Sequence, residues 1–186
     1  MTGDTQNAKR RSPPGFKSVK AELGALSSSY DEGVIRVVYE MIAEELYTTR
    51  EDHFATTELA ATVASRLRER RISIVNLERI VEEIARVLAP GAGFVKARMR
   101  DYRGSLQKII WRVLARRIDP ACVNTGRMAR DIIALIESNH MASIGELAVT
   151  LSSGKRYRQI PIELLEELLY AVFSFYVTKG LARQMR

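Results

Sequence analysis

A 24-residue segment occurs twice in this chain, and it constrains the fold more than any other feature of the sequence. The first copy, residues 58–81, reads ELAATVASRLRERRISIVNLERIV, and the second, residues 146–169, reads ELAVTLSSGKRYRQIPIELLEELL. The copies align without a gap at an offset of 88 residues, and eleven of the 24 positions are identical. Such a match indicates that one structural unit is built twice.

Apolar periodicity and capping residues predict a similar order of elements around each copy. Apolar residues that recur every three to four positions are typical of amphipathic helices, and alternating ones are typical of strands. The predicted helices cover about 31–47, 57–71, 74–88, 105–117, 127–138, 143–153 and 161–178, and the predicted short strands cover 54–56, 94–100 and 181–186. The expected fold class is therefore mainly α with minor β.

These elements divide the chain into a tail, two units and a connector. Residues 1–28 contain the sequence SPPG and several Lys and Arg residues, which predicts a flexible basic tail. The units cover residues 29–101 and 121–186. Between them, residues 102–120 are expected to form an amphipathic helix with one apolar and one basic face.

The order helix, short strand, helix, turn, helix, strand resembles the winged-helix variant of the helix-turn-helix. The resemblance also rests on the ELA sequence of the second helix and on a glycine before the last strand, and it covers residues 30–100 and 127–186. The second strand of the wing is not visible in either unit, so the wings are expected to be short or missing. The resemblance implies DNA binding, with a unit's third helix in the major groove.

The charge of the chain also favours nucleic acid as a partner. The net charge is +7, with +3 in residues 1–30, −2 in 31–101, +4 in 102–126 and +2 in 127–186. A basic protein is attracted to phosphates, although a solvated Arg-rich surface gives the same totals. We therefore expect binding of double-stranded DNA, mainly through its phosphates, in transcription regulation, replication or chromatin organisation.

Candidate DNA-binding residues fall into three groups: the turn before the third helix of each unit, the basic face of the connector, and the third helix of the first unit. Cations at a helix end also complement the helix dipole, which is the alternative interpretation of the turns. The third helix of the second unit carries three glutamates near its start and is not expected to read DNA. The candidates are Arg66, Arg68, Arg70, Arg71, Asn76, Arg79, Lys108, Arg112, Arg116, Lys155, Arg156 and Arg158.

The predicted helix over 161–178 is apolar on almost every side, which is typical of a helix buried on more than one face. It could contact the first unit, the connector or a second chain, and the sequence favours a symmetric homodimer. The expected interface residues are Leu168, Leu169, Val172, Phe173 and Tyr176. A winged-helix protein-interaction subunit of a larger nucleic-acid-processing assembly is the alternative function.

The sequence contains no pattern that predicts an enzyme, a metal site or a cofactor. Its one cysteine, Cys122, excludes a zinc site with several thiolates and an intramolecular disulfide. His53 and His140, one in each unit, are interpreted as polar caps. There is no phosphate-cradling glycine loop and no nucleophile motif.

The sequence also predicts no association with a membrane. No apolar run approaches the roughly 18 residues that span a bilayer. The first residues lack the apolar core of a signal peptide. A cytoplasmic location is therefore expected, at the nucleoid if DNA is bound.

Overall fold

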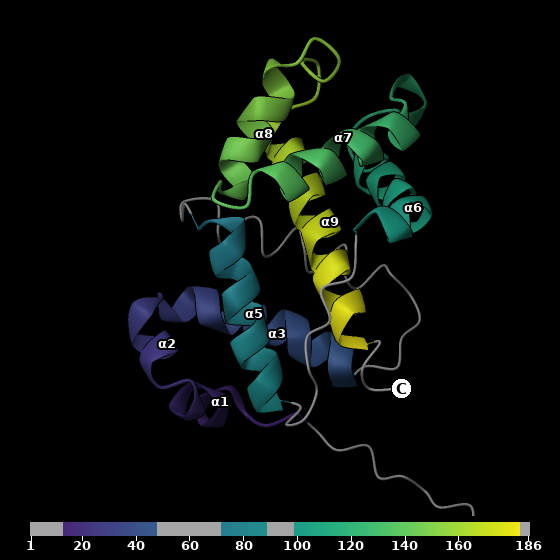
Figure 1. Cartoon of the computed structure of the whole chain (residues 1–186). Helices are drawn as coiled ribbons and strands as arrows, with labels where there is room; N and C mark the ends of the chain where they lie inside the picture. Colours follow the sequence, from purple (N-terminus) through teal and green to yellow (C-terminus); the bar gives the residue numbers. More distant parts are fainter. Residues whose placement is uncertain (1–12, 48–71, 89–98, 183–186) are drawn as a thin grey trace, which may run out of the picture.

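The computed structural model describes residues 13–47, 72–88 and 99–182 (Figure 1). These residues are mainly helical, which confirms the helical part of the expected class. The α-helices are α1 (Phe16–Glu22), α2 (Ala25–Ser29), α3 (Glu32–Tyr47), α5 (Ile74–Leu88), α6 (Arg103–Leu114), α7 (Thr125–Ser138), α8 (Ile144–Ser153) and α9 (Ile162–Ala182). Two short 3-10 helices, η1 (Met99–Tyr102) and η2 (Pro120–Cys122), flank α6.

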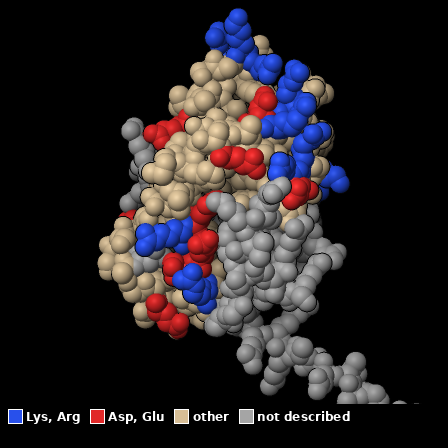
Figure 2. All heavy atoms as spheres, viewed as in Figure 1, with Lys and Arg blue, Asp and Glu red and all other residues tan. Residues whose placement is uncertain are grey.

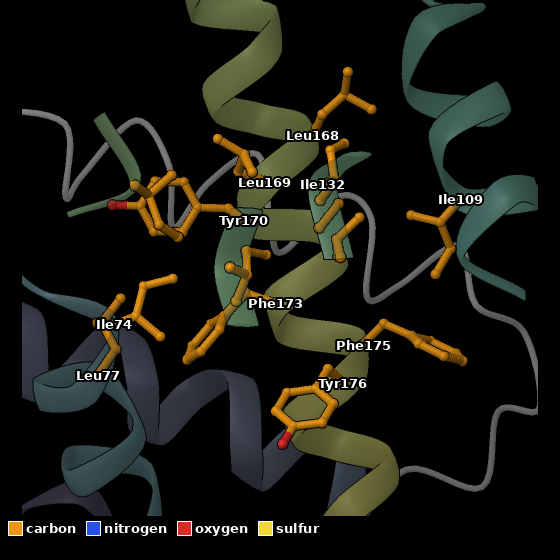
Figure 3. Packing of buried hydrophobic residues seen from close by; sticks show 14 of the residues in the cluster. Ile74, Leu77, Ile109, Ile132, Leu168, Leu169, Tyr170, Phe173, Phe175 and Tyr176 are labelled. Carbon is orange, nitrogen blue, oxygen red and sulfur yellow. The ribbon is translucent and has the colours of Figure 1, made fainter. Parts of the chain in front are cut away.

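Helix α9 lies at the centre of the molecule and contacts α3, α5, α6 and α8 (Figure 1). Figure 3 shows Phe173 and Phe175 leaving α9 on different sides, with Phe173 directed toward Ile74 and Leu77 of α5. Each fully buried large apolar side chain contributes about 1.5–3 kcal/mol. The core of the described residues is therefore organised around α9, whose side chains with 0 % exposure are Leu164, Leu165, Leu168, Leu169 and Val172.

This packing corrects the predicted dimer interface. The helix is buried on several sides, as its sequence predicted, but the burial occurs within one chain. The five residues assigned to the interface are at most 5 % exposed, because the surrounding helices of the same chain already cover them. Of the three contacts considered from the sequence, the structure shows those with the first unit and with the connector. The predicted interface residues that are buried in this way are Leu168, Leu169, Val172, Phe173 and Tyr176.

The repeat encodes equivalent starts for two helices. Helix α5 begins at Ile74 and α9 at Ile162, which are 88 residues apart, the offset of the repeat. The identical residues Leu77 and Leu165 are both buried. The helices differ in length, at 15 and 21 residues. The predicted end of α9 at residues 179–180 is wrong, since a glycine weakens a helix by about 1 kcal/mol without forcing it to end.

The predicted flexible tail is wrong from residue 13 onward. Helices α1 and α2 occupy most of residues 16–29. Val19 is fully buried and Leu23 is 8 % exposed, because one turn of α1 brings both residues against the α3 and α5 layer. The guanidinium of Arg36 lies 4.6 Å from the centre of the Phe16 ring. Residues 1–12 of the predicted tail lie outside the described part of the chain.

The predicted strands and the tandem winged helices are not confirmed. In the described ranges, extended pairing is limited to one antiparallel bridge between Ser73 and Ser143. That bridge joins the two predicted units instead of forming a wing. Met99 and Arg100 lie in η1 and residues 181–182 in α9, so the strands predicted there are wrong. The strand at 54–56 and residues 94–98 lie outside the described residues.

Candidate nucleic-acid interface

Eight of the twelve predicted nucleic-acid-binding residues lie in the described part of the chain, on three separate elements. Arg66, Arg68, Arg70 and Arg71, and the helix predicted around them, lie outside the described residues. The remaining candidates lie on three separate elements: Asn76 and Arg79 on α5, Lys108, Arg112 and Arg116 along α6 and the turn after it, and Lys155, Arg156 and Arg158 in the loop after α8.

The start of α5, the predicted reading helix, is covered by the second half of the chain. The backbone N–H of Ile74 donates to the carbonyl of Ala142, and that of Val75 donates to the carbonyl of His140, both at 3.0 Å. Helices that enter the major groove present their first residues to the bases. Two of the N–H groups at this end are already paired. Arg79 is exposed one turn further along, while Asn76 is half-buried.

The glutamates of α5 also disfavour groove reading. Glu78 is buried, and Glu83 forms an ion pair with Arg86 at 2.9 Å on an exposed part of the helix. Glu82, which is half-buried three residues after Arg79, adds a further carboxylate, so the acidic groups of α5 offset the charge of Arg79 toward a phosphate. The start of α5 is therefore poorly suited to a DNA groove.

Helix α6 exposes one basic side and buries the other. Its apolar side chains lie against α7 and α9. Lys108 and Arg112, one turn apart, lie on the other side, and Arg116 follows in the next turn; Lys108 and Arg116 are exposed, and Arg112 is half-buried. Neither Lys108 nor Arg116 has an ion-pair partner among the described residues. Trp111, 52 % exposed, lies one helical turn after Lys108, to one side of the row of cations. We refer to the three cations Lys108, Arg112 and Arg116 as the α6 surface; Trp111 lies next to it and is not part of it.

The basic loop, residues 154–160, follows α8 and is held by Tyr157. The side chain of Tyr157 is buried, and its hydroxyl donates to Oδ2 of Asp131 on α7 at 2.7 Å. Burial, and then Asp131, raise the pKa of Tyr157, so the phenol remains a neutral donor. The sequence placed this tyrosine among the exposed cations, but its ring is not available to a ligand.

The cations of the basic loop are not equivalent. Nη1 of Arg156 lies 3.7 Å from Oδ2 of Asp131, so part of its charge is neutralised. Lys155 and Arg158 are exposed and have no ion pair with the described residues. A hollow of about 640 Å³ opens between α7, α8 and this loop. Arg127, on the same side of α7 as Asp131, acts electrostatically on Tyr157 and extends the cluster.

Figure 2 shows Lys and Arg side chains gathered at the end of the molecule formed by the basic loop and along the flank formed by α6 and the start of α7. Sequence reasoning missed Arg103, Arg127 and Arg130, which are exposed on α6 and α7. The spacing of Arg127 and Asp131 put them on one helix face. Only the fold shows that the basic loop packs beside that face.

Other kinds of site find no support in the described residues. No group of three or more His, Cys, Asp or Glu side chains there is placed to hold a metal ion. The carbonyl of His140 accepts the hydrogen bond from Val75, while His53 lies outside the described part. Of the helices described, none is both long and apolar enough to cross a membrane.

No protein-family model, curated protein or solved structure is similar to this chain. Its own residues and their geometry are therefore the basis for a functional proposal.

Proposed function

We propose that this protein binds nucleic acid through the phosphate backbone, with double-stranded DNA as the ligand that the sequence predicts. The observation that carries the proposal is the α6 surface. Its cations follow one side of a helix whose opposite side is fixed in the core. A row of cations on a fixed helix is suited to successive phosphates, because little backbone freedom remains to be lost on binding.

The contacts proposed are tolerant of sequence. Phosphate contacts position a protein on nucleic acid, whereas contacts to base edges specify the sequence. The start of α5 makes hydrogen bonds to the loop before α8, so the element that winged helices use to read bases is engaged elsewhere. Transcription regulation, replication and chromatin organisation all use proteins with such backbone contacts.

The alternative function is that of a protein-interaction subunit. Two features favour it, the acidic third helices and the apolar helix over 161–178, and the apolar helix is covered by α3, α5, α6 and α8 of the same chain. Burial within the chain accounts for the apolar sequence without a partner.

The salt dependence of binding tests the proposal. Fluorescence anisotropy of a labelled DNA duplex would be measured between about 50 and 200 mM salt. Three phosphate contacts from the α6 surface predict a slope of log K against log salt of about −2.7, which is a loss of affinity of about 40-fold over this range. Absence of binding at the lowest salt would contradict the proposal.

A matched pair of double variants locates the contact. Lys108→Gln with Arg116→Gln removes two cations from the α6 surface and should reduce the slope by about 1.8. Lys17→Gln with Arg86→Gln removes the same charge from exposed positions on α1 and α5. These helices lie on another part of the molecule (Figure 1). Equal effects of the two pairs would show attraction by net charge alone and would refute the assignment to α6.

A further inference from the structure

Trp111 is the one tryptophan of the chain, and it lies half-exposed on α6. Lys108 precedes it by one helical turn, and Arg112 follows it directly. Tryptophan is usually well buried in folded proteins, because its ring has a large apolar surface. The 52 % exposure of Trp111 leaves much of that surface in water.

The core does not require an indole at this position. The apolar face of α6 is complete without it, since the residues directed at α7 and α9 are at most 3 % exposed: Leu106, Ile109, Ile110, Val113 and Leu114. Because those residues are buried, α6 also has no apolar face to insert into a lipid surface. An exposed aromatic ring one helical turn from an exposed lysine matches a ligand that has both flat rings and negative charges.

We propose that Trp111 stacks on an unpaired base, and that the α6 surface therefore binds single-stranded nucleic acid more tightly than a duplex of the same length. This inference rests on the proposed function for its phosphate contacts. In a duplex each base stacks on its neighbours, so a side chain at the surface reaches phosphates but not base faces. A single strand can place a phosphate on Lys108, which is exposed one helical turn before Trp111, and a base on the indole.

Intrinsic fluorescence reports on this contact directly, because all tryptophan emission of the protein comes from Trp111. The whole chain would be titrated with oligo-dT of about 12 nucleotides and with its oligo-dA duplex, at about 50 mM salt. Labelled oligonucleotide anisotropy would be followed in parallel. We expect the single strand to bind more tightly and to quench the emission at saturation. Saturated anisotropy with unchanged emission would overturn the stacking inference.

Variants at Trp111 separate stacking from charge. Trp111→Ala should weaken single-strand binding by at least about fivefold, with duplex affinity unchanged, and Trp111→Phe should restore part of the loss. The duplex acts as an internal control for folding, together with an unchanged Tm. An equal loss for both ligands, or tighter binding of duplex by the original chain, would overturn the inference while leaving phosphate binding intact. Failure of both ligands to bind would instead reject the proposed function itself.

Discussion

Arg117 donates a hydrogen bond to the buried carboxylate of Glu167, with Nη2 and Oε1 2.7 Å apart. Arg117 lies in the turn after α6 and Glu167 in α9, 50 residues later. The arginine side chain is 52 % exposed, and the glutamate side chain is 10 % exposed. The pair therefore joins the predicted connector to the central helix. The glutamate carboxylate has lost more of its contact with water than the arginine guanidinium has.

Removing the arginine should be worse than removing both charges. We expect Arg117→Ala to reduce the free energy of unfolding by about 1–3 kcal/mol, because it leaves a buried carboxylate without this donor. Arg117→Met with Glu167→Leu should lie within about 1 kcal/mol of the original chain, since an apolar pair needs no partner. Urea unfolding measures both values. A harmless Arg117→Ala would show that water replaces the guanidinium.

Substitutions of buried residues in α9 should reduce the stability of the fold, and they should not alter the oligomeric state. Leu169 is fully buried, so Leu169→Ala should reduce the free energy of unfolding by about 2–5 kcal/mol. Val149→Ala on α8, at a side chain that is 54 % exposed, is the control and should change it by less than about 0.5 kcal/mol. Sedimentation velocity should give a monomer of 21.0 kDa. If the original chain sedimented as a dimer and Leu169→Ala as a monomer, the dimer interface predicted from the sequence would be supported instead.

Stability should decrease in alkaline solution because of Tyr176. Burial, and then Glu78, raise the pKa of Tyr176 from its ordinary value of 10.0 to about 12. The folded state therefore keeps this proton at a pH where the unfolded chain has lost it. The associated stability is complete below pH 10 and is lost as the pH rises to about 12, with a slope of at most about 1.4 kcal/mol per pH unit.

Tyr176→Phe tests this origin. The variant has no titrating phenol at this position, so its free energy of unfolding should fall less steeply between pH 10 and about 12 than that of the original chain. Urea unfolding at several pH values measures the two slopes. Tyr157, whose pKa is also raised, continues to contribute in both proteins. Identical slopes would exclude Tyr176 as a source.

The hydrogen bond from Tyr157 to Asp131 should control how often the basic loop opens. Tyr157→Phe keeps the buried ring and removes the donor, which contributes about 1 kcal/mol. Trypsin cleaves after Lys155, Arg156 and Arg158 when the loop is open, so cleavage there should accelerate about fivefold. Ser152→Ala, at the nearby end of α8, is a control that leaves this bond in place. No acceleration in Tyr157→Phe would show that ring burial alone holds the loop.

Substitutions on α5 should separate base reading from backbone binding. Because the start of α5 is paired with the loop before α8, Asn76→Ala and Arg79→Ala should each change DNA affinity by less than about twofold. Anisotropy with two duplexes of unrelated sequence measures affinity and discrimination together. If either variant lost a difference in affinity between the two duplexes, the start of α5 would have to release the loop before α8 and contact bases.

Several helix starts could be predicted because their causes are local. Ser143 caps α8, with its hydroxyl accepting from the N–H of Glu146 and the Glu146 carboxylate accepting from the N–H of Ser143. Asn124 caps α7 in the same way, accepting from the N–H of Arg127. Such signals lie within a few residues of each other, so they can be read from the chain alone.

The candidate site was predicted less completely, because exposure depends on what packs nearby. The cations of α6 were expected on a helix face from their spacing, and that face is exposed. Tyr157 lies between Arg156 and Arg158 in the sequence, but its side chain is buried and its hydroxyl donates to Asp131 of α7. Nothing in the spacing of the second copy indicates that contact.

The sequence by itself determined the helical class, the equivalent starts of α5 and α9, and the two-faced character of α6. All of these depend on periodicity and capping, which act over one or two helical turns. Only the tertiary structure decided which surface covers α9, that the start of α5 is engaged with the second half, and that Trp111 remains exposed beside Arg112. These features depend on contacts between distant segments, and two apolar faces fit together by shape as well as by pattern.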